Sequence, residues 1–176
     1  MKTFEFAIIA SGLDRTADDF ETQFYDAGCD DATVSFQKGV TIVDFAREAR
    51  SIDEAIELAV RDVRKAGARI ERIEPDPLVS LSDIATRANM SRAAMSNYAS
   101  ALRGKDFPAP VARVTTDSPL WDWVEVSQWL CLNNRVSREM VIEARAVRAA
   151  NAALQAASGD IGARVRDGSG AVEVTH

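Results

Sequence analysis

The chain has 176 residues, of which 47% are hydrophobic and 27% are charged, and its formal net charge is −6; such a composition is typical of a globular protein of one or two domains. Its two cysteines and single histidine, His176, exclude a disulfide scaffold, a zinc site and a histidine-dependent triad, so we expect no metal, no cofactor and no enzymatic activity. No apolar run of about 18 residues occurs and residues 1–5 lack the order of a signal peptide, so we expect a cytoplasmic protein without a membrane partner.

The first 76 residues are predicted to form strands and helices in the order β-α-β-β-α-β. The stretch "TFEFAIIAS" has alternating apolar side chains, which is typical of a strand, and Thr16 with Asp19 then forms a capping box that would begin a helix. "ATVSFQKGVTIVDFA" predicts two strands joined at Lys38–Gly39, Ser51 opens a second helix, and "ARIERIE" predicts a last strand. This order is that of the ferredoxin-like split fold.

The predicted ferredoxin-like domain is acidic, with 10 Lys and Arg against 17 Asp and Glu in residues 1–77. Asp44 lies within a strand, where we favour a simple exposed position over contact with a ligand. The adjacent Asp30 and Asp31 are interpreted as solvated turn residues. A small-molecule effector, a second copy of the domain and a partner protein all remain open as the binding partner of this domain.

A second domain, residues 77–133, is predicted after a proline-containing linker. The stretch "SDIATRANMSRAAMSNYA" predicts two short helices that meet at a corner. Ser80 and Asp83 form a capping box for the first helix. Asn89 can adopt the left-handed conformation that ends it, and Ser91 caps the second helix. Two helices joined by such a turn are typical of a helix-turn-helix.

The second helix of this corner, residues 91–102, has an apolar and a polar face. Met95, Tyr98 and Leu102 share the apolar face. On the other side, an Arg can pair with guanine, an Asn with adenine and a Ser with either base. The residues expected to contact bases are Arg92, Ala93, Ser96 and Asn97. An ordinary helical hairpin with a solvated polar face is the other interpretation.

A hairpin is predicted after the two helices. Phe107–Pro108 enters it, and "VARVTTDSPLWDWVEVSQWL" predicts a strand at Val111–Val114, a polar loop, a second strand near Leu120–Trp121 and a short helix. With "LVSLSDIATRANMSRAAMSNYA" before the hairpin and "LWDWVEVSQWL" closing it, residues 78–132 resemble the winged helix-turn-helix of MerR-type and phage excisionase-type DNA-binding proteins.

This resemblance implies that the second helix enters the major groove of double-stranded DNA and that the hairpin rests on the backbone, with the four residues named above at the bases. The residues expected to contact the DNA backbone are Ser91, Arg103, Lys105 and Arg113. Because so few cations would neutralise few phosphates, a monomer is expected to bind weakly and with strong salt dependence. We therefore expect a homodimer on the DNA.

A C-terminal helix is predicted over residues 134–158, followed by a flexible tail over residues 159–176 that is rich in glycine. An apolar stripe recurs along this helix at alternating steps of four and three, which is the spacing of a coiled coil. The stripe, and hence the predicted dimerisation surface, consists of Met140, Ala144, Val147, Asn151 and Leu154. Packing of the same stripe onto its own chain is equally compatible with the pattern.

The predicted fold is therefore α+β, with a ferredoxin-like domain, a winged helix-turn-helix and a C-terminal helix. The predicted function is that of a transcriptional regulator that binds double-stranded DNA in a sequence-specific manner. An excisionase-like architectural protein or an antitoxin would use the same surface. A protein-interaction adaptor without DNA binding is the interpretation from another functional class.

Overall fold

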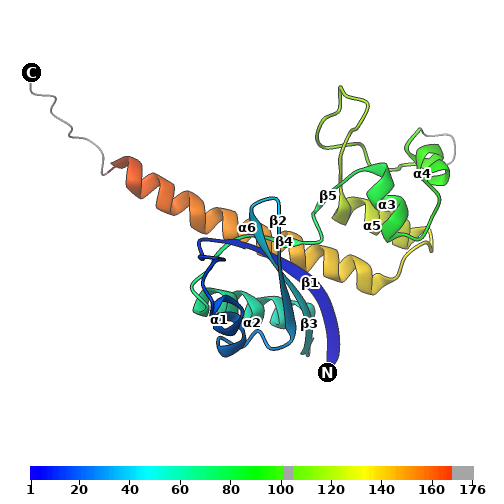
Figure 1. Ribbon diagram of the computed structural model, residues 1–176. Coiled ribbons are helices and arrows are strands. Elements are labelled where there is room, and N and C mark those ends of the chain that lie inside the picture. Colours follow the sequence, from blue (N-terminus) through cyan, green and yellow to red (C-terminus); the bar gives the residue numbers. More distant parts are fainter. Residues whose placement is uncertain (101–104, 168–176) are drawn as a thin grey trace, which may run out of the picture.

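The computed structural model describes residues 1–100 and 105–167, with residues 160–167 described by their backbone (Figure 1). The protein has an α+β fold with a four-stranded antiparallel sheet and a separate two-stranded sheet, which confirms the predicted fold class. No helix in the described part of the chain has both the length and the apolar character needed to cross a bilayer.

The N-terminal unit contains the larger sheet. Its elements are β1 (Lys2–Ser11), α1 (Phe20–Asp26), β2 (Ala32–Gln37), β3 (Val40–Ala49), α2 (Ile52–Lys65) and β4 (Arg69–Glu74). The strands lie in the order β2-β3-β1-β4, and Phe6 on β1 pairs with Phe45 on β3. Apolar side chains of α1 and α2 pack on the face of the sheet that carries Phe6 and Phe45, and they form one continuous core with it. Both helices therefore cover the same face.

Of the two N-caps predicted for α1 and α2, one is present and one is not. α2 begins as expected, because the Ser51 side chain accepts a hydrogen bond from the Glu54 backbone N–H. The predicted capping box at Thr16 and Asp19 is wrong, since α1 begins at Phe20 and Asp19 makes no side-chain cap. The Thr16 backbone and hydroxyl donate instead to the Asp14 carboxylate, at 2.9 and 2.6 Å, which fixes a turn before the helix.

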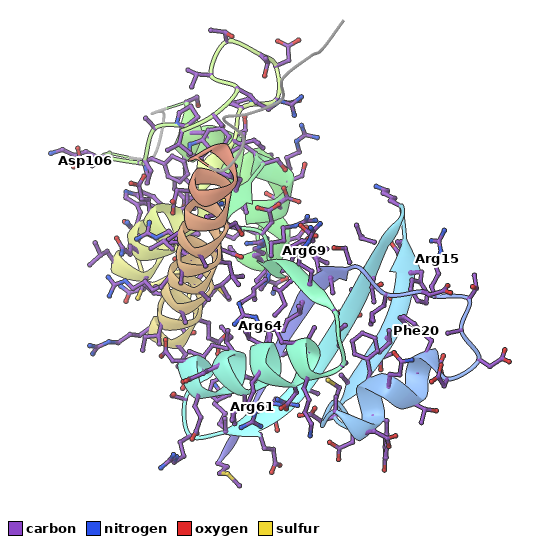
Figure 2. The ribbon with its side chains drawn as sticks, turned by 90° about the vertical axis from the view of Figure 1, so that its left-hand side faces the viewer. Arg15, Phe20, Arg61, Arg64, Arg69 and Asp106 are labelled. Carbon is purple, nitrogen blue, oxygen red and sulfur yellow. The ribbon has the colours of Figure 1, made fainter. Side chains whose placement is uncertain are left out.

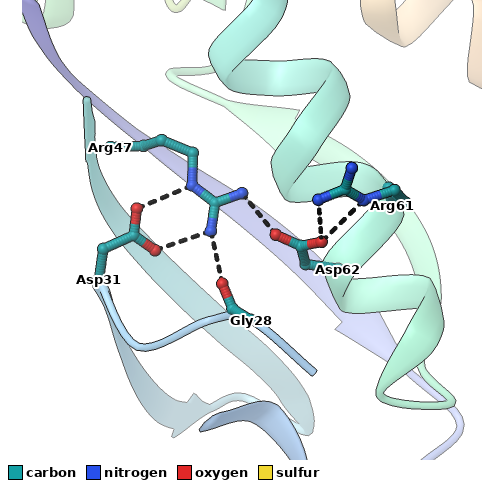
Figure 3. Close-up of polar contacts among 5 residues, drawn as sticks. All are labelled: Gly28, Asp31, Arg47, Arg61 and Asp62. Carbon is teal, nitrogen blue, oxygen red and sulfur yellow. Dashed lines mark hydrogen bonds and ion pairs between the residues drawn. The ribbon is translucent and has the colours of Figure 1, made fainter. Parts of the chain in front are cut away.

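A buried ion-pair network ties the α1–β2 loop to α2 (Figure 3). Arg47, on the inward face of β3, is 6% exposed and donates to both carboxylate oxygens of Asp31, at 2.7 and 2.8 Å. It also donates to Asp62 on α2 and to the Gly28 carbonyl, both at 2.8 Å. Arg61 bonds the second oxygen of Asp62 from the solvent side. Asp31 is therefore an ion-pair partner, and the interpretation of it as a solvated turn residue is wrong.

Cys29 lies beside this network and is 3% exposed. Burial, followed by the negative charge of Asp62, raises the pKa of its thiol to about 11. Such a pKa leaves roughly one thiolate in a thousand at about pH 8, and only the thiolate is nucleophilic. We expect iodoacetamide to modify the half-buried Cys131 in the native protein and to reach Cys29 only in urea, as peptide mass spectrometry would report; labelling of native Cys29 at the rate of Cys131 would contradict this.

The second unit contains the helical corner. Its elements are β5 (Leu78–Val79), α3 (Leu81–Arg87), α4 (Arg92–Ala99), β6 (Trp121–Asp122) and α5 (Trp123–Leu132). The predicted hairpin is only partly correct. Ala112 and Leu120 form a single antiparallel bridge, and no strand covers Val111–Val114. Trp121 pairs with Val79 of β5 instead. The second sheet therefore joins the residues after the loop to the strand that begins this unit.

The last helix, α6 (Arg138–Asp167), runs along both units (Figure 1). It continues to Asp167, so the boundary predicted at residue 158 and the flexible tail from residue 159 are wrong over residues 159–167. Ala144 is buried in the core of the second unit, whereas Val147 is buried in the core of the first. α6 therefore joins the two units through its apolar side.

The stripe predicted as a dimer seam is occupied within the chain. Met140 packs on the core of the second unit, and Leu154 packs on the core of the first. Asn151 is 9% exposed, accepts a hydrogen bond from the Ile73 backbone N–H at 2.8 Å and donates to the Ile73 carbonyl at 2.9 Å. The Asn151 amide thus pairs both backbone groups of Ile73 on the outer edge of β4, where no further strand pairs. The stripe therefore packs onto its own chain in this structure.

Candidate nucleic-acid interface

The corner between α3 and α4 is held by local hydrogen bonds. Ser80 and Asp83 form the predicted capping box, with Ser80 N–H donating to the carboxylate at 2.8 Å. Asn89 has a φ of 52°, the left-handed conformation expected at this turn. The Met90 N–H donates to the Ala85 carbonyl at 2.8 Å. The capping box begins α3, whereas the left-handed Asn89 and the Met90–Ala85 bond end it and set the direction in which α4 leaves.

α4 buries one side and leaves the other open. Met95 is fully buried and packs in the same core as Ile84 of α3. Arg92, Ala93 and Ser96 are exposed, whereas Asn97 is half-buried. The predicted helix of residues 91–102 is shorter in the structure, because Ser100 is the C-cap and residues 101–102 lie outside the described residues. Three of the four predicted base-contact residues thus lie at the surface, and Asn97 lies at its edge.

The N-terminal unit does not cover this surface. Figure 1 shows α4 at the periphery of the molecule, on the side of α3 and α5 that is turned away from the four-stranded sheet. Ser91, at the start of α4, is also exposed, and its hydroxyl accepts the Ala94 N–H at 3.1 Å. An extended partner can therefore approach α4 without displacing the acidic unit.

Two indole groups anchor the chain that follows the corner. Trp129 Nε1–H donates to the Lys105 carbonyl at 3.1 Å, and Trp121 Nε1–H donates to the Pro108 carbonyl at 3.0 Å. The Phe107 ring packs edge-on against both indoles, and Tyr98 of α4 packs on Trp129, with 5.2 Å between centroids. The backbone of Lys105 is thereby held beside α4. Sequence reasoning missed these anchors, although a buried indole N–H needs an acceptor.

The loop over residues 109–120 projects from the second unit (Figure 1). Its base is closed by Val111 N–H to the Leu120 carbonyl at 2.8 Å and by Leu120 N–H to the Ala112 carbonyl at 2.9 Å. Arg113 has a φ of 53° and is exposed, and its carbonyl accepts the Thr116 hydroxyl at 2.8 Å. The loop is therefore a short wing with one bridge and an internally bonded tip, in place of the expected hairpin strands.

The charge of this surface is weakly positive. Arg92, Lys105 and Arg113 are exposed, and none of them makes an ion pair with another described residue. Asp106 projects from the ribbon beside Lys105 (Figure 2), and Asp117 is exposed in the loop. Arg103, the remaining predicted backbone contact, lies outside the described residues. Each chain therefore offers few cations to phosphates, as the sequence indicates.

Comparisons with known proteins are negative: no protein-family model, no curated protein and no solved structure matches this chain. The resemblance to MerR-type and excisionase-type proteins accordingly remains an expectation from the motifs of residues 78–132. Any functional assignment therefore depends on the geometry of α3, α4 and the loop of residues 109–120.

Proposed function

We propose that the protein is a transcriptional regulator that binds double-stranded DNA through α4 and the loop of residues 109–120. The observation that supports this most directly is the two-sided character of α4. Buried Met95 fixes the helix, and Arg92, Ala93 and Ser96 are exposed at its N-terminal part. In helix-turn-helix proteins, N-terminal residues of the second helix reach base edges in the major groove, and Arg and Ser are side chains that read them.

The same proposal assigns a more specific fold to each of the two units. The strand order β2-β3-β1-β4, with both helices packed on one face, supports a ferredoxin-like N-terminal domain. The single bridge between Ala112 and Leu120 supports a reduced wing after the two helices. Lys105 precedes the wing and Arg113 lies within it. In this arrangement both would contact phosphates, which position a protein on DNA without reading sequence.

Two copies are expected to bind one duplex, since the three exposed cations among the described residues of this surface neutralise few phosphates. A seam along the predicted stripe of α6 would compete with contacts that the stripe makes inside the chain, such as the bonds between Asn151 and Ile73. The pairing surface of the DNA-bound form is therefore expected elsewhere on the chain. Sedimentation of the protein–DNA complex gives the number of copies bound.

Arg92→Ala is expected to weaken binding to a selected duplex by about 1–3 kcal/mol and to relax preference at one base pair. Lys105→Ala should weaken binding to all sequences alike and reduce the slope of log affinity against log salt by about one. Fluorescence anisotropy over a salt series separates these effects. Arg138→Ala, which removes an exposed cation at the start of α6, is the control and should match the wild type. Equal preference in the Arg92→Ala variant and the wild type would contradict the assignment of Arg92.

Selection from a random pool of duplexes tests the function as a whole. We expect enrichment of a defined sequence by the full chain at about 50 mM salt, where even non-specific binding to duplex is strong. Bending of the enriched duplex would indicate an architectural protein, and tight association with a co-expressed toxin would indicate an antitoxin. Absence of any DNA binding at this salt concentration would refute the proposal.

A protein-interaction adaptor is the second candidate, and the open face of the four-stranded sheet favours it. Asp44 is exposed there, as expected from the sequence, and Glu48 of β3 and Glu5 of β1, which pairs with Ala46, are exposed further along the same face. No helix of the N-terminal unit packs on this face, because the core lies on the other one. An acidic surface of this kind suits a basic protein partner. Binding of such a partner, without DNA binding at low salt, would support this candidate.

A further inference from the structure

A cavity of about 210 Å³ lies where the two units meet. Its apolar wall comes from both units and from the helix that joins them: Phe6, Ile52, Trp123, Met140, Ala144 and Val147. The volume lies below the roughly 300–1,000 Å³ of pockets that hold drug-sized ligands. The cavity is therefore suited to a small molecule with an apolar body.

One cation lines this cavity and has unused hydrogen-bond capacity. Arg87, the last residue of α3, is half-buried, and its guanidinium carbon lies 5.2 Å from the centroid of the Trp123 ring. Its Nη1 is buried and has no hydrogen-bond partner among the described residues. Burial lowers the pKa of Arg87, although the charges of Asp83, Asp76 and Glu74 act in the opposite direction. A buried charged donor without an acceptor is costly, and a ligand that supplies the acceptor removes this cost.

We propose that this cavity binds a small monocarboxylate with an apolar body, whose carboxylate accepts hydrogen bonds from Arg87. The planar guanidinium matches the two oxygens of a carboxylate and binds it more strongly than a neutral acceptor. The apolar body would pack on Trp123 and Ala144. Because Arg87 ends the helix that leads into the Asn89 corner, the ligand would contact the element that positions α4.

The other charges of the wall define the ligand further. Glu143 also lines the cavity, but it is paired with Lys2 at 3.3 Å. Glu5 lines the cavity too and is exposed, so water screens its charge more than it screens the buried Nη1. A single carboxylate is thus compatible with the site, whereas a second carboxylate would find no cation besides Arg87 among the residues that line the cavity. The site should discriminate against dicarboxylates.

Titration of the full chain with benzoate, followed by calorimetry, tests the proposal in the absence of DNA. We expect saturable binding at one site, and at least about tenfold weaker binding of benzamide and of terephthalate, because the former lacks the charge and the latter adds one. Arg87→Met should weaken benzoate binding by about tenfold or more. Arg138→Met removes an exposed cation that does not line the cavity, and it should leave benzoate binding unchanged.

A second variant tests the proposal even if the first, Arg87→Met, does not fold. Ala144→Leu adds side-chain volume to the cavity wall and should abolish benzoate binding while Arg87 stays in place. Arg87→Met should melt no lower than the wild type, since it removes a buried donor without a partner. Benzoate binding that does not saturate, or that is equal in the wild type and both variants, would overturn the proposal. None of these outcomes depends on whether the protein binds DNA.

Discussion

Arg47→Met is expected to lower the free energy of unfolding by about 3–5 kcal/mol, because breaking a buried ion pair leaves its partner charge without compensation. Methionine retains much of the apolar packing of the arginine stem, so the loss of stability mainly reports the missing charge and its hydrogen bonds. Asp62, which is 5% exposed, would keep only the solvent-side Arg61. The Gly28 carbonyl would also lose the donor that bonds it at 2.8 Å.

Urea unfolding of the wild type, of Arg47→Met and of Arg50→Met measures this effect. Arg50→Met is a matched control, because it makes the same change in charge and volume three residues further along the chain. The Arg50 side chain is 83% exposed and pairs with Glu54 in solvent, and such pairs add little stability. Equal unfolding midpoints for the two variants would show that the network does not stabilise the fold.

Asn151→Leu is expected to destabilise the protein by about 1–3 kcal/mol for each of the two Ile73 backbone groups that it leaves unpaired. The two side chains are similar in volume, so leucine fills the space but offers neither donor nor acceptor. Ile73 lies on the edge strand β4, and its side chain is fully buried. Water is therefore poorly placed to replace the amide, and the junction between β4 and α6 should loosen first.

Hydrogen exchange of the Ile73 amide, together with urea unfolding, measures this second effect. Gln155→Leu is the control, because Gln155 lies one turn further along α6 and is exposed. We expect loss of protection at Ile73 in the Asn151 variant only. Retained protection and an unchanged unfolding midpoint would instead mean that Asn151 has its main role outside the chain, as a coiled-coil seam would require.

Local patterns in the sequence predicted those elements that local interactions stabilise. The Ser51 cap and the left-handed Asn89 depend on side-chain and backbone conformation within a few residues, and both are present. The inward position of Arg47 also follows from the alternation of β3, in which Val43 and Phe45 face the core. Its partners could not be predicted, since Asp62 comes from an element that joins it only through the tertiary fold.

Apart from the local capping box at Thr16 and Asp19, the errors concern long-range choices. The heptad spacing of α6 predicts an apolar stripe correctly but does not distinguish a second helix from the chain's own cores, where Val147 and Leu154 pack. The wing was predicted from β-prone residues near Val111, yet Trp121 pairs with Val79 and leaves only one bridge for the loop. In the candidate interface, the local part, α3 and α4, was predictable, and the indole anchors that fix Lys105 were not.

The most direct test of the central claim is the change in backbone amide chemical shifts when a selected duplex is added to the full chain. We expect the changes to concentrate on residues 91–97 and 105–120, and to diminish as salt is raised above about 50 mM. Shifts confined to the open sheet face around Asp44, or no shifts at all at that salt concentration, would contradict DNA binding by α4.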